Sequence, residues 1–187
     1  NGRIFEDMVK KFGLPNKNFI HCTRELKIRP IEHWKKVNGY KENRRALGIR
    51  HDEFRRVKND KDYIFPLATI FKTSKEDVLN FWKEQPFDLT IPEHLGNCTW
   101  CYKKSNKKLS LVVQDMPEAF NFVKHLEDNY SMVKSNGSPR IIFRGNRTSY
   151  DVLSNKDFDL DDKEDCNEEC GVIIPVDLES TVVHKEI

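Results

Sequence analysis

Five cysteines carry the chemistry that is easiest to interpret in this chain, at positions 22, 98, 101, 166 and 170. The pairs Cys98-x2-Cys101 and Cys166-x3-Cys170 together supply four thiolates, the number that tetrahedral zinc or an iron–sulfur cluster requires. The odd cysteine count and the absence of a signal-peptide pattern argue against a disulfide framework. We therefore predict a metal site for zinc or a 4Fe–4S cluster at Cys98, Cys101, Cys166 and Cys170, in a cytoplasmic protein.

Cys22 lies at the predicted start of a helix, within the segment His21–Lys27. The N-terminus of a helix stabilises anions, so one interpretation makes Cys22 a thiolate or a metal ligand. The other makes it a small residue that packs the start of the helix. For Cys170, a metal ligand, a nucleophile and a thiol without a role all stay open.

Three arginines, Arg50, Arg55 and Arg56, follow a predicted strand in the segment Gly48–Arg56. Ligands of open α/β sheets bind beyond the carboxyl ends of strands, and the guanidinium fork matches phosphate or sulfate. With Lys27, these arginines form the predicted nucleotide- or sulfate-binding set. A solvated charged loop is the alternative. No catalytic residue is assigned.

The net charge of +2 hides a gradient along the chain. Residues 1–60 carry 16 Lys and Arg against 8 Asp and Glu, whereas residues 151–187 carry 3 against 12. A basic front half suits an anionic ligand such as a nucleotide or a nucleic-acid backbone. No run approaches the 18 apolar residues of a membrane span, so no membrane partner is expected. The start at Asn1, without Met, suggests a piece of a longer chain.

Hydrophobic periodicity predicts helices over Phe5–Phe12, Thr23–Val37, Leu109–Val113 and Pro117–Tyr130, and short strands over Arg45–Ile49, Tyr63–Leu67 and Val172–Val176. In the second helix, Leu26, Ile31 and Trp34 are expected to face inward. A capping box of Thr73 with Glu76 predicts a further helix through Glu84, whose buried face would hold Val78, Leu79, Phe81 and Trp82. The alternation favours an α/β sheet followed by a mostly helical appendix, divided as residues 1–95 and 96–187.

Taken in order, these segments resemble the phosphoadenosine phosphosulfate (PAPS) reductase-like family of the PP-loop, or adenine nucleotide α-hydrolase, superfamily. The family has a cysteine-containing helix start followed by a basic residue, matched here by Cys22 through Lys27. A Gly-x-Arg signature follows, matched by Gly48, Arg50, Glu53 and Arg56. Then come Pro66-Leu67, a helix with Asp77-Val78, and a loop into the C-x2-C. The resemblance covers roughly residues 15–105.

The resemblance implies a partial Rossmann-like sheet that binds an adenine nucleotide, ATP or PAPS. The family's phosphate loop, Ser-Gly-Gly-x-Asp-Ser, is absent here, because no two of the eight glycines are adjacent. The chain alone should therefore bind nucleotide weakly. Iron–sulfur members of the family have a Cys-Cys pair at the first motif, where this chain has Cys22-Thr23. A ligand set of Cys22, Cys98 and Cys101 with one of Cys166 or Cys170 is then a second arrangement.

The resulting expectation is a sulfonucleotide reductase or sulfotransferase type of protein. Two alternatives stay open. One is a PP-loop enzyme of nucleic-acid sulfur modification, whose phosphate backbone would meet the basic run Lys103–Lys108. The other is a non-catalytic interaction module held together by its metal. Whether the protein forms a homodimer is left open.

Overall fold

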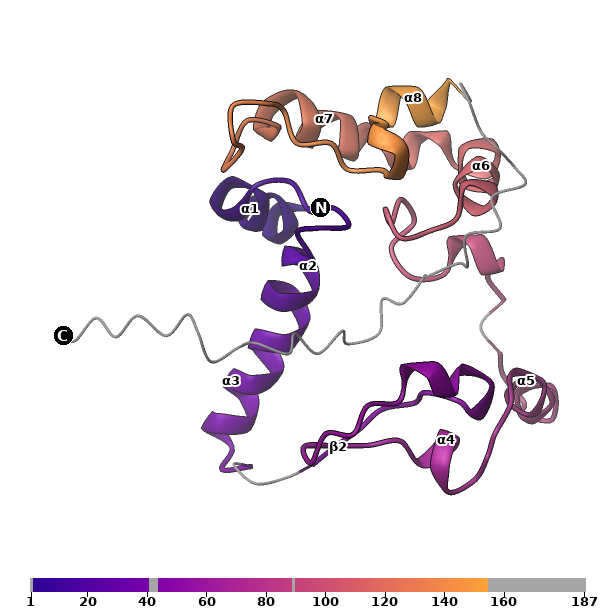
Figure 1. Cartoon of the computed structure of the whole chain (residues 1–187). Helices are drawn as coiled ribbons and strands as arrows, with labels where there is room; N and C mark the ends of the chain where they lie inside the picture. Colours follow the sequence, from indigo (N-terminus) through magenta and orange to yellow (C-terminus); the bar gives the residue numbers. More distant parts are fainter. Residues whose placement is uncertain (1, 41–43, 89, 155–187) are drawn as a thin grey trace. The chain divides into compact units, whose positions relative to one another are not determined.

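The structure is a computed structural model that describes residues 2–40, 44–88 and 90–154 (Figure 1). It divides into two compact units: unit 1 contains residues 1–32 and 92–187, and unit 2 contains residues 33–91. This division differs from the expected 1–95 and 96–187, because the N-terminal helix packs with elements late in the sequence. Among the described residues, no helix is both long and apolar enough to cross a membrane. The expected strand Val172–Val176 lies outside the described residues.

Unit 1 is helical in its described part. Its elements are α1 (Arg3–Phe12), α2 (His21–Thr23), η1 (Arg24–Ile28), η3 (Glu93–Leu95), α6 (Asn106–Asp115), η4 (Pro117–Ala119), α7 (Phe120–Tyr130), η5 (Arg144–Asn146) and α8 (Ser149–Leu153). The helices predicted over Phe5–Phe12, Leu109–Val113 and Pro117–Tyr130 are therefore confirmed, with the second extended at both ends.

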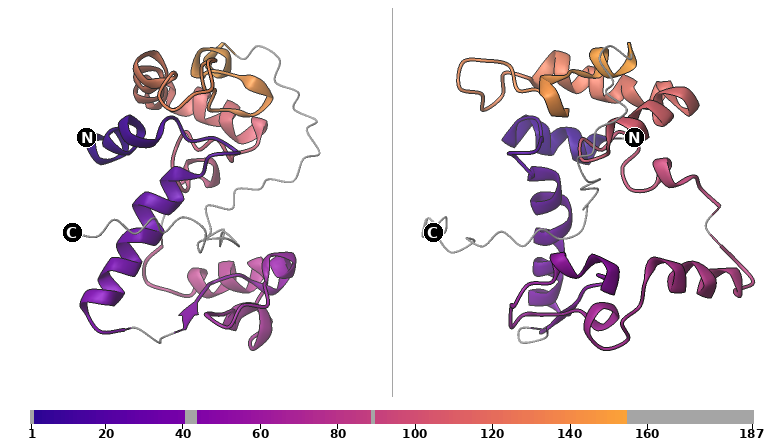
Figure 2. Two further views of the ribbon diagram at one scale, coloured as in Figure 1. Left: turned by 60° about the vertical axis from the view of Figure 1, so that its left-hand side comes forward. Right: turned by 45° about the vertical axis from the view of Figure 1, so that its right-hand side comes forward.

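The predicted helix Thr23–Val37 is also confirmed, as one continuous rod of α2, η1 and α3 (Arg29–Val37) (Figure 2). η1 is a π-helical segment, a local widening that proteins often keep near functional sites. Leu26 packs against the core of unit 1 as predicted. Ile31 and Trp34 do not, because they are 47% and 56% exposed on α3, which buries none of its residues.

The core of unit 1 joins α1, α6, α7 and α8. Its fully buried side chains include Val9, Val112, Phe120 and Val152, each with 0% exposure. These four come from helices far apart in the sequence, so the core forms only when both ends of the described chain meet. Burial of such side chains contributes roughly 1.5–3 kcal/mol each to the stability of the fold.

A polar contact also fastens α1 to α7. The Glu6 carboxylate accepts hydrogen bonds from the Tyr130 hydroxyl at 2.7 Å and from His125 Nε2 at 3.2 Å, and lies 3.2 Å from Lys10 Nζ. The hydrogen bond from Tyr130, followed by those from His125 and Lys10, lowers the pKa of Glu6 to about 2. Glu6 is therefore ionised at neutral and mildly acidic pH.

A buried carboxyl group joins α7 to α8. Glu127 is 7% exposed, and its Oε2 accepts hydrogen bonds from the backbone N–H of Ser149 at 2.8 Å and from the Ser149 hydroxyl at 2.5 Å. Its other oxygen, Oε1, is buried and has no hydrogen-bond partner among the described residues. Burial raises the pKa of Glu127, and the hydrogen bonds from Ser149 only partly oppose this shift.

The raised pKa of Glu127 predicts a pH-dependent effect of Glu127→Gln. Because the folded pKa lies above the unfolded one, wild-type stability from this group is fully present at acid pH and is lost as pH rises through the folded pKa. Glutamine does not titrate. The free energy of unfolding of the variant, relative to that of the wild type, should therefore rise by roughly 1.4 kcal/mol for each pH unit between the two pKa values. Urea unfolding at pH 4 and pH 8 measures this difference. An equal difference at both pH values would contradict it.

Unit 2 contains the only two strands among the described residues, β1 (Arg45–Ala46) and β2 (Tyr63–Ile64), together with η2 (His51–Arg56), α4 (Pro66–Thr69) and α5 (Lys75–Lys83). The strands pair in parallel, with Arg45 opposite Tyr63 and Ala46 opposite Ile64. Both lie within the predicted strands but are shorter, since α4 already begins at Pro66. A mixed α/β architecture is thus confirmed at the level of a small parallel sheet.

The predictions for α5 are right about its existence and wrong about its details. The N-cap is Ser74, not Thr73: the Ser74 hydroxyl accepts from the Asp77 N–H at 3.2 Å, and the Asp77 carboxylate accepts from the Ser74 N–H at 2.7 Å. The expected buried face is absent, because α5 buries none of its residues and Leu79 and Phe81 are 50% and 55% exposed. Periodicity identifies an apolar face but does not supply the surface that covers it.

Candidate functional site

Three cysteines from distant parts of the sequence line one pocket in unit 1. Cys22 comes from α2, and Cys98 and Cys101 come from the turns that follow η3. The pocket has about 330 Å³ of empty space, counting the solvent at its mouth, and its lining surface is apolar. The remaining lining residues are Phe5, Thr23, Trp100, Tyr102 and Lys103. Sequence analysis gave Cys22 two interpretations, and the structure places it beside the C-x2-C motif.

Two consecutive turns hold the C-x2-C motif. The Cys101 N–H donates to the Cys98 carbonyl at 3.0 Å, and the Lys104 N–H donates to the Cys101 carbonyl at 3.0 Å. Asn97, just before the motif, has a φ of 59°, in the left-handed region that asparagine tolerates better than most residues. The turns bury Cys101 and leave Cys98 exposed. On the opposite wall, Cys22 Sγ lies 3.9 Å from the Tyr102 hydroxyl.

Aromatic rings close one side of this pocket. Phe5 and Trp100 meet edge to face, with ring centroids 5.1 Å apart and an interplanar angle of 86°. Phe122 lies 6.2 Å from both of these rings, centroid to centroid. Phe5 belongs to α1 and Phe122 to α7, two of the four helices that form the core, so the core supports this side of the pocket.

Lys104 fixes the loop that leads into the cysteines. Its side chain is buried, with a residue exposure of 2%, and its ammonium group donates hydrogen bonds to the backbone carbonyls of His94 and of Gly96, the latter at 2.8 Å. A buried ammonium group is stable only when such acceptors satisfy it. Sequence analysis treated Lys104 as part of a basic surface, and the structure shows that it lies inside.

Lys104→Met should therefore loosen the segment before Cys98 and lower the stability of unit 1. The carbonyls of His94 and Gly96 lose their donor, at a cost of about 1–3 kcal/mol for buried unsatisfied groups. Lys107→Met is the matched control. It makes the same substitution three residues later, at an exposed position of α6. Hydrogen exchange of the peptide covering residues 94–98 measures the effect. Equal exchange in the two variants would show that Lys104 does not hold this loop.

His21, next to Cys22, belongs to a stack of rings that sequence analysis did not foresee. It lies between Phe12 and Phe19, with centroid distances of 5.6 Å and 5.8 Å and interplanar angles of 29° and 20°. Burial lowers the pKa of His21, and the positive charges of Arg24 and Arg140 lower it further. The ring of His21, the first residue of α2, is therefore neutral at neutral pH. No sequence signal finds this stack, because Phe12 ends α1 and Phe19 lies in the segment between α1 and α2.

The donor types suit a soft metal, but the described residues do not complete a site. Among them, no three His, Cys, Asp or Glu side chains lie close enough together to hold a metal ion. Cys166 and Cys170, the other two predicted ligands, lie outside the described residues. His94, four residues before Cys98, does not complete such a group among the described residues but pairs with Asp115: its Nε2 lies 2.6 Å from Asp115 Oδ2. Its backbone carbonyl accepts a hydrogen bond from Lys104.

The predicted anion-binding residues lie in both units. Lys27 is exposed on η1, and the three arginines lie on or beside η2 in unit 2. Arg50 Nε donates to Asp52 Oδ1 at 2.9 Å, and Arg56 donates to Glu53 Oε1 at 2.7 Å. Glu53 Oε2 lies 3.3 Å from the Arg50 guanidinium, so Glu53 joins the two arginines.

These ion pairs reduce the positive charge that η2 presents to a ligand. Burial alone would raise the pKa of Asp52, but the hydrogen bonds from Arg50 and from the Lys75 N–H outweigh it and lower that pKa. Asp52 is thus a carboxylate at neutral pH and competes for Arg50 with any phosphate or sulfate. Arg55 is exposed on the same helical segment.

The basic run Lys103–Lys108 offers less surface for a nucleic-acid backbone than its composition suggests. Lys104 is buried, and Lys108 lies 3.0 Å from Glu93 Oε1. Lys107 is the one lysine of the run that is exposed, whereas Lys103 and Lys108 are partly buried. Because counterion release needs several exposed cations along a phosphate backbone, this observation weakens the nucleic-acid interpretation.

Comparison with known proteins finds similarity to the uncharacterized nin region protein ORF290 of Escherichia phage lambda. The two are 40% identical over an alignment of 157 residues, and the match covers 80% of this chain and 52% of the lambda protein. The chain thus spans about half the length of this relative. No protein-family model matches the sequence. No solved structure matches it either.

Proposed function

We propose that this chain is the cysteine-bearing part of a sulfur-transfer protein that uses an adenine nucleotide, of the sulfonucleotide reductase or sulfotransferase type. One observation supports this above the others: Cys22 and the Cys98-x2-Cys101 motif line the same pocket. These are the first and last motifs of the family resemblance, the cysteine at a helix start and the C-x2-C. The small parallel sheet of unit 2 would be part of a Rossmann-like sheet.

The proposal gives Cys98 and Cys101 the role of thiolate ligands, completed either by Cys166 and Cys170 or by Cys22 and one of these two. A 4Fe–4S cluster or a zinc ion bound there would shape the site next to the nucleotide. Metal, iron and acid-labile sulfide are measured on protein purified without oxygen, together with an absorption spectrum. A brown protein with iron and sulfide supports the proposed function, whereas protein without any metal would contradict it.

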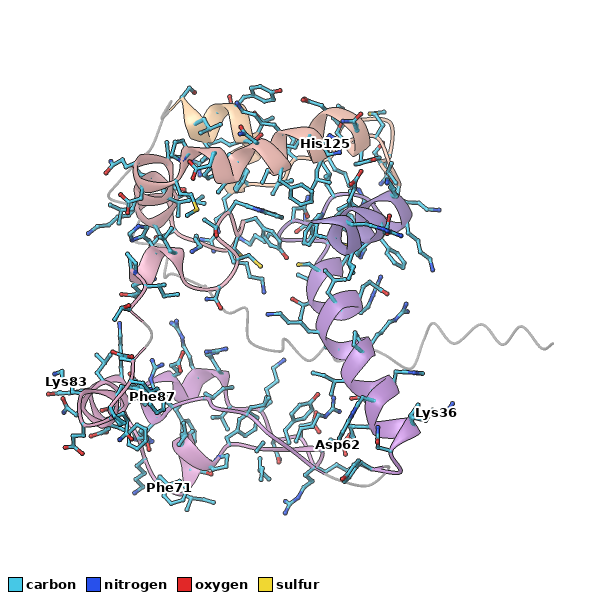
Figure 3. The ribbon with its side chains drawn as sticks, turned by 180° about the vertical axis from the view of Figure 1, so that it is seen from behind. Lys36, Asp62, Phe71, Lys83, Phe87 and His125 are labelled. Atoms are coloured by element: carbon cyan, nitrogen blue, oxygen red, sulfur yellow. The ribbon has the colours of Figure 1, made fainter. Side chains whose placement is uncertain are left out.

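The anion-binding half of the proposal predicts that Asp52→Asn strengthens nucleotide binding. Removing this carboxylate releases Arg50 for a phosphate or sulfate, so we expect ATP and PAPS to bind roughly three- to tenfold more tightly, or by about 1 kcal/mol. Asp62→Asn is the matched control, because it makes the same charge change at an exposed position of unit 2 (Figure 3). Isothermal titration calorimetry gives both affinities. An equal gain in both variants would mean that net charge, and not Arg50, is responsible.

A second candidate, a non-catalytic module held together by its metal, is favoured by the apolar lining of the pocket. A site for chemistry on a sulfate or phosphate needs polar groups directed at the reacting atoms. The full-length lambda relative distinguishes the two candidates. Hydrolysis of ATP to AMP and pyrophosphate by that protein supports the enzyme, and colourless protein with zinc but no nucleotide binding supports the module.

A further inference from the structure

Unit 2 leaves most of its large apolar side chains exposed. In its described part, four apolar side chains are buried, those of Ile49, Tyr63, Phe65 and Ala68. The exposed ones have exposures between 38% and 70% and include Phe54, Ile70, Phe71, Leu79, Phe81, Trp82 and Phe87. Phe71 and Phe87 lie on the segments that flank α5 (Figure 3). So small a core does not offset the conformational entropy of ordering the segment, which indicates that unit 2 folds against further protein.

The sheet of unit 2 shows where that protein joins. Arg45 N–H donates to Asp62 O at 2.8 Å and Leu47 N–H donates to Ile64 O at 2.9 Å. Strand residues alternate in direction, so the N–H and C=O of Ala46, between these two, point away from β2. Ala46 is exposed, and among the described residues β1 has β2 as its one neighbour. Within the part of the chain that the structure describes, the outer side of β1 is therefore an open edge.

The backbone groups on the other edge of β2 already make hydrogen bonds. Tyr63 N–H donates to Asp60 O at 3.2 Å, and Phe65 O accepts from Ala68 N–H at 3.1 Å and from Thr69 N–H at 2.9 Å. These bonds belong to the turn before β2 and to the start of α4. A third strand at that side would have to break them. The sheet can grow without such a cost only at β1.

We infer that the β1 edge is a docking site for a further polypeptide segment, which adds a strand parallel to β1, and that further protein also covers the exposed apolar face of α5. Parallel sheets occur with both faces covered and rarely with two strands, which is why the added strand should be parallel. The lambda relative has about half of its length outside the matched stretch, and that part is the source we assign. The inference deepens the part of the proposed function that makes this sheet a piece of a Rossmann-like sheet, but it does not depend on the proposed sulfur chemistry.

A second copy of this chain fits the β1 edge less well than the extra length of the lambda relative. Two β1 edges related by a twofold axis, the commonest symmetry of homodimers, would pair antiparallel. The pair already present in unit 2 is parallel. A symmetric dimer would therefore build a mixed sheet.

Hydrogen exchange on this chain and on the full-length lambda protein tests the inference. In this chain, the Ala46 amide should exchange at least tenfold faster than the Leu47 amide, which is bonded to β2. In the lambda protein, the peptides that align with β1 and α5 should exchange at least tenfold more slowly than in this chain. Peptides from α6 and α7, in the core of unit 1, should exchange alike in both proteins and serve as the internal control.

Two results would overturn the inference. If the β1 and α5 peptides exchange as fast in the lambda protein as in this chain, the extra length does not cover them. If the Ala46 amide is protected in this chain alone, the occupant is a part of this chain or a second copy. A concentration series then separates these two, because protection by a second copy is lost on dilution. These readouts do not include metal content or nucleotide affinity. Failure of this inference can therefore be distinguished from failure of the proposed function.

Discussion

Cys101→Ser should reduce the bound metal to less than a tenth of that in the unmodified chain. Cys101 is buried in the turn that faces Cys22, and serine offers a hard, protonated oxygen where zinc or an iron–sulfur cluster needs a soft thiolate. Cys98→Ser should have the same effect, since one lost thiolate leaves three ligands. Elemental analysis of the variants, purified without oxygen, provides the measurement. Circular dichroism verifies that each variant is folded.

Cys22→Ser decides between the two ligand sets. If Cys22 is a ligand, this variant loses metal as Cys101→Ser does, and only one of Cys166→Ser and Cys170→Ser also loses it. The other of these two then serves as the matched control with full metal content. If Cys22→Ser keeps its metal while both Cys166→Ser and Cys170→Ser lose it, the ligands are Cys98, Cys101, Cys166 and Cys170. That outcome would remove the pocket as support for the proposed function.

Phe120→Ala should lower the free energy of unfolding by about 3–5 kcal/mol. Phe120 begins α7, is 0% exposed and lies with its ring centroid 6.1 Å from that of Phe143. Its removal leaves a cavity where α6, α7 and α8 meet. Urea unfolding followed by circular dichroism measures the loss.

Phe81→Ala is the matched control for this prediction. The same substitution on α5 removes a ring that is 55% exposed, so we expect a change within about 0.5 kcal/mol. A loss in Phe81→Ala as large as that in Phe120→Ala would mean that α5 is covered in the isolated chain. The contrast between the two phenylalanines therefore tests where the core of this chain lies.

Local sequence patterns identified most of the helices correctly. The segments Phe5–Phe12 and Pro117–Tyr130 show the 3.6-residue apolar period, and both are helical and face the core of unit 1. Hydrogen bonds within a helix join residues four apart, so the information that specifies a helix lies within a few turns of chain. The same holds for the N-cap of α5, although the pattern placed it one residue early, at Thr73 in place of Ser74.

Burial was predicted less well, because it depends on what packs against a face. Leu26 and Trp34 belong to the same predicted apolar face, yet Leu26 contacts the core and Trp34 is 56% exposed. Lys104 shows the reverse error. A residue type typical of surfaces is buried here, because two backbone carbonyls accept hydrogen bonds from its ammonium group. Neither outcome is encoded within one helix turn of the residue concerned.

The sequence by itself determined which residue types are available for chemistry: the thiols, the three arginines and the motifs that resemble a family. Only the tertiary structure decided which of them meet. It brought Cys22 to the pocket of Cys98 and Cys101, whereas the pairing of Arg50 with Asp52 and of Arg56 with Glu53 is local, between residues two and three positions apart. Residues 76 positions apart become neighbours only through the packing of α1, α6 and α7, which depends on the fit of many side chains at once.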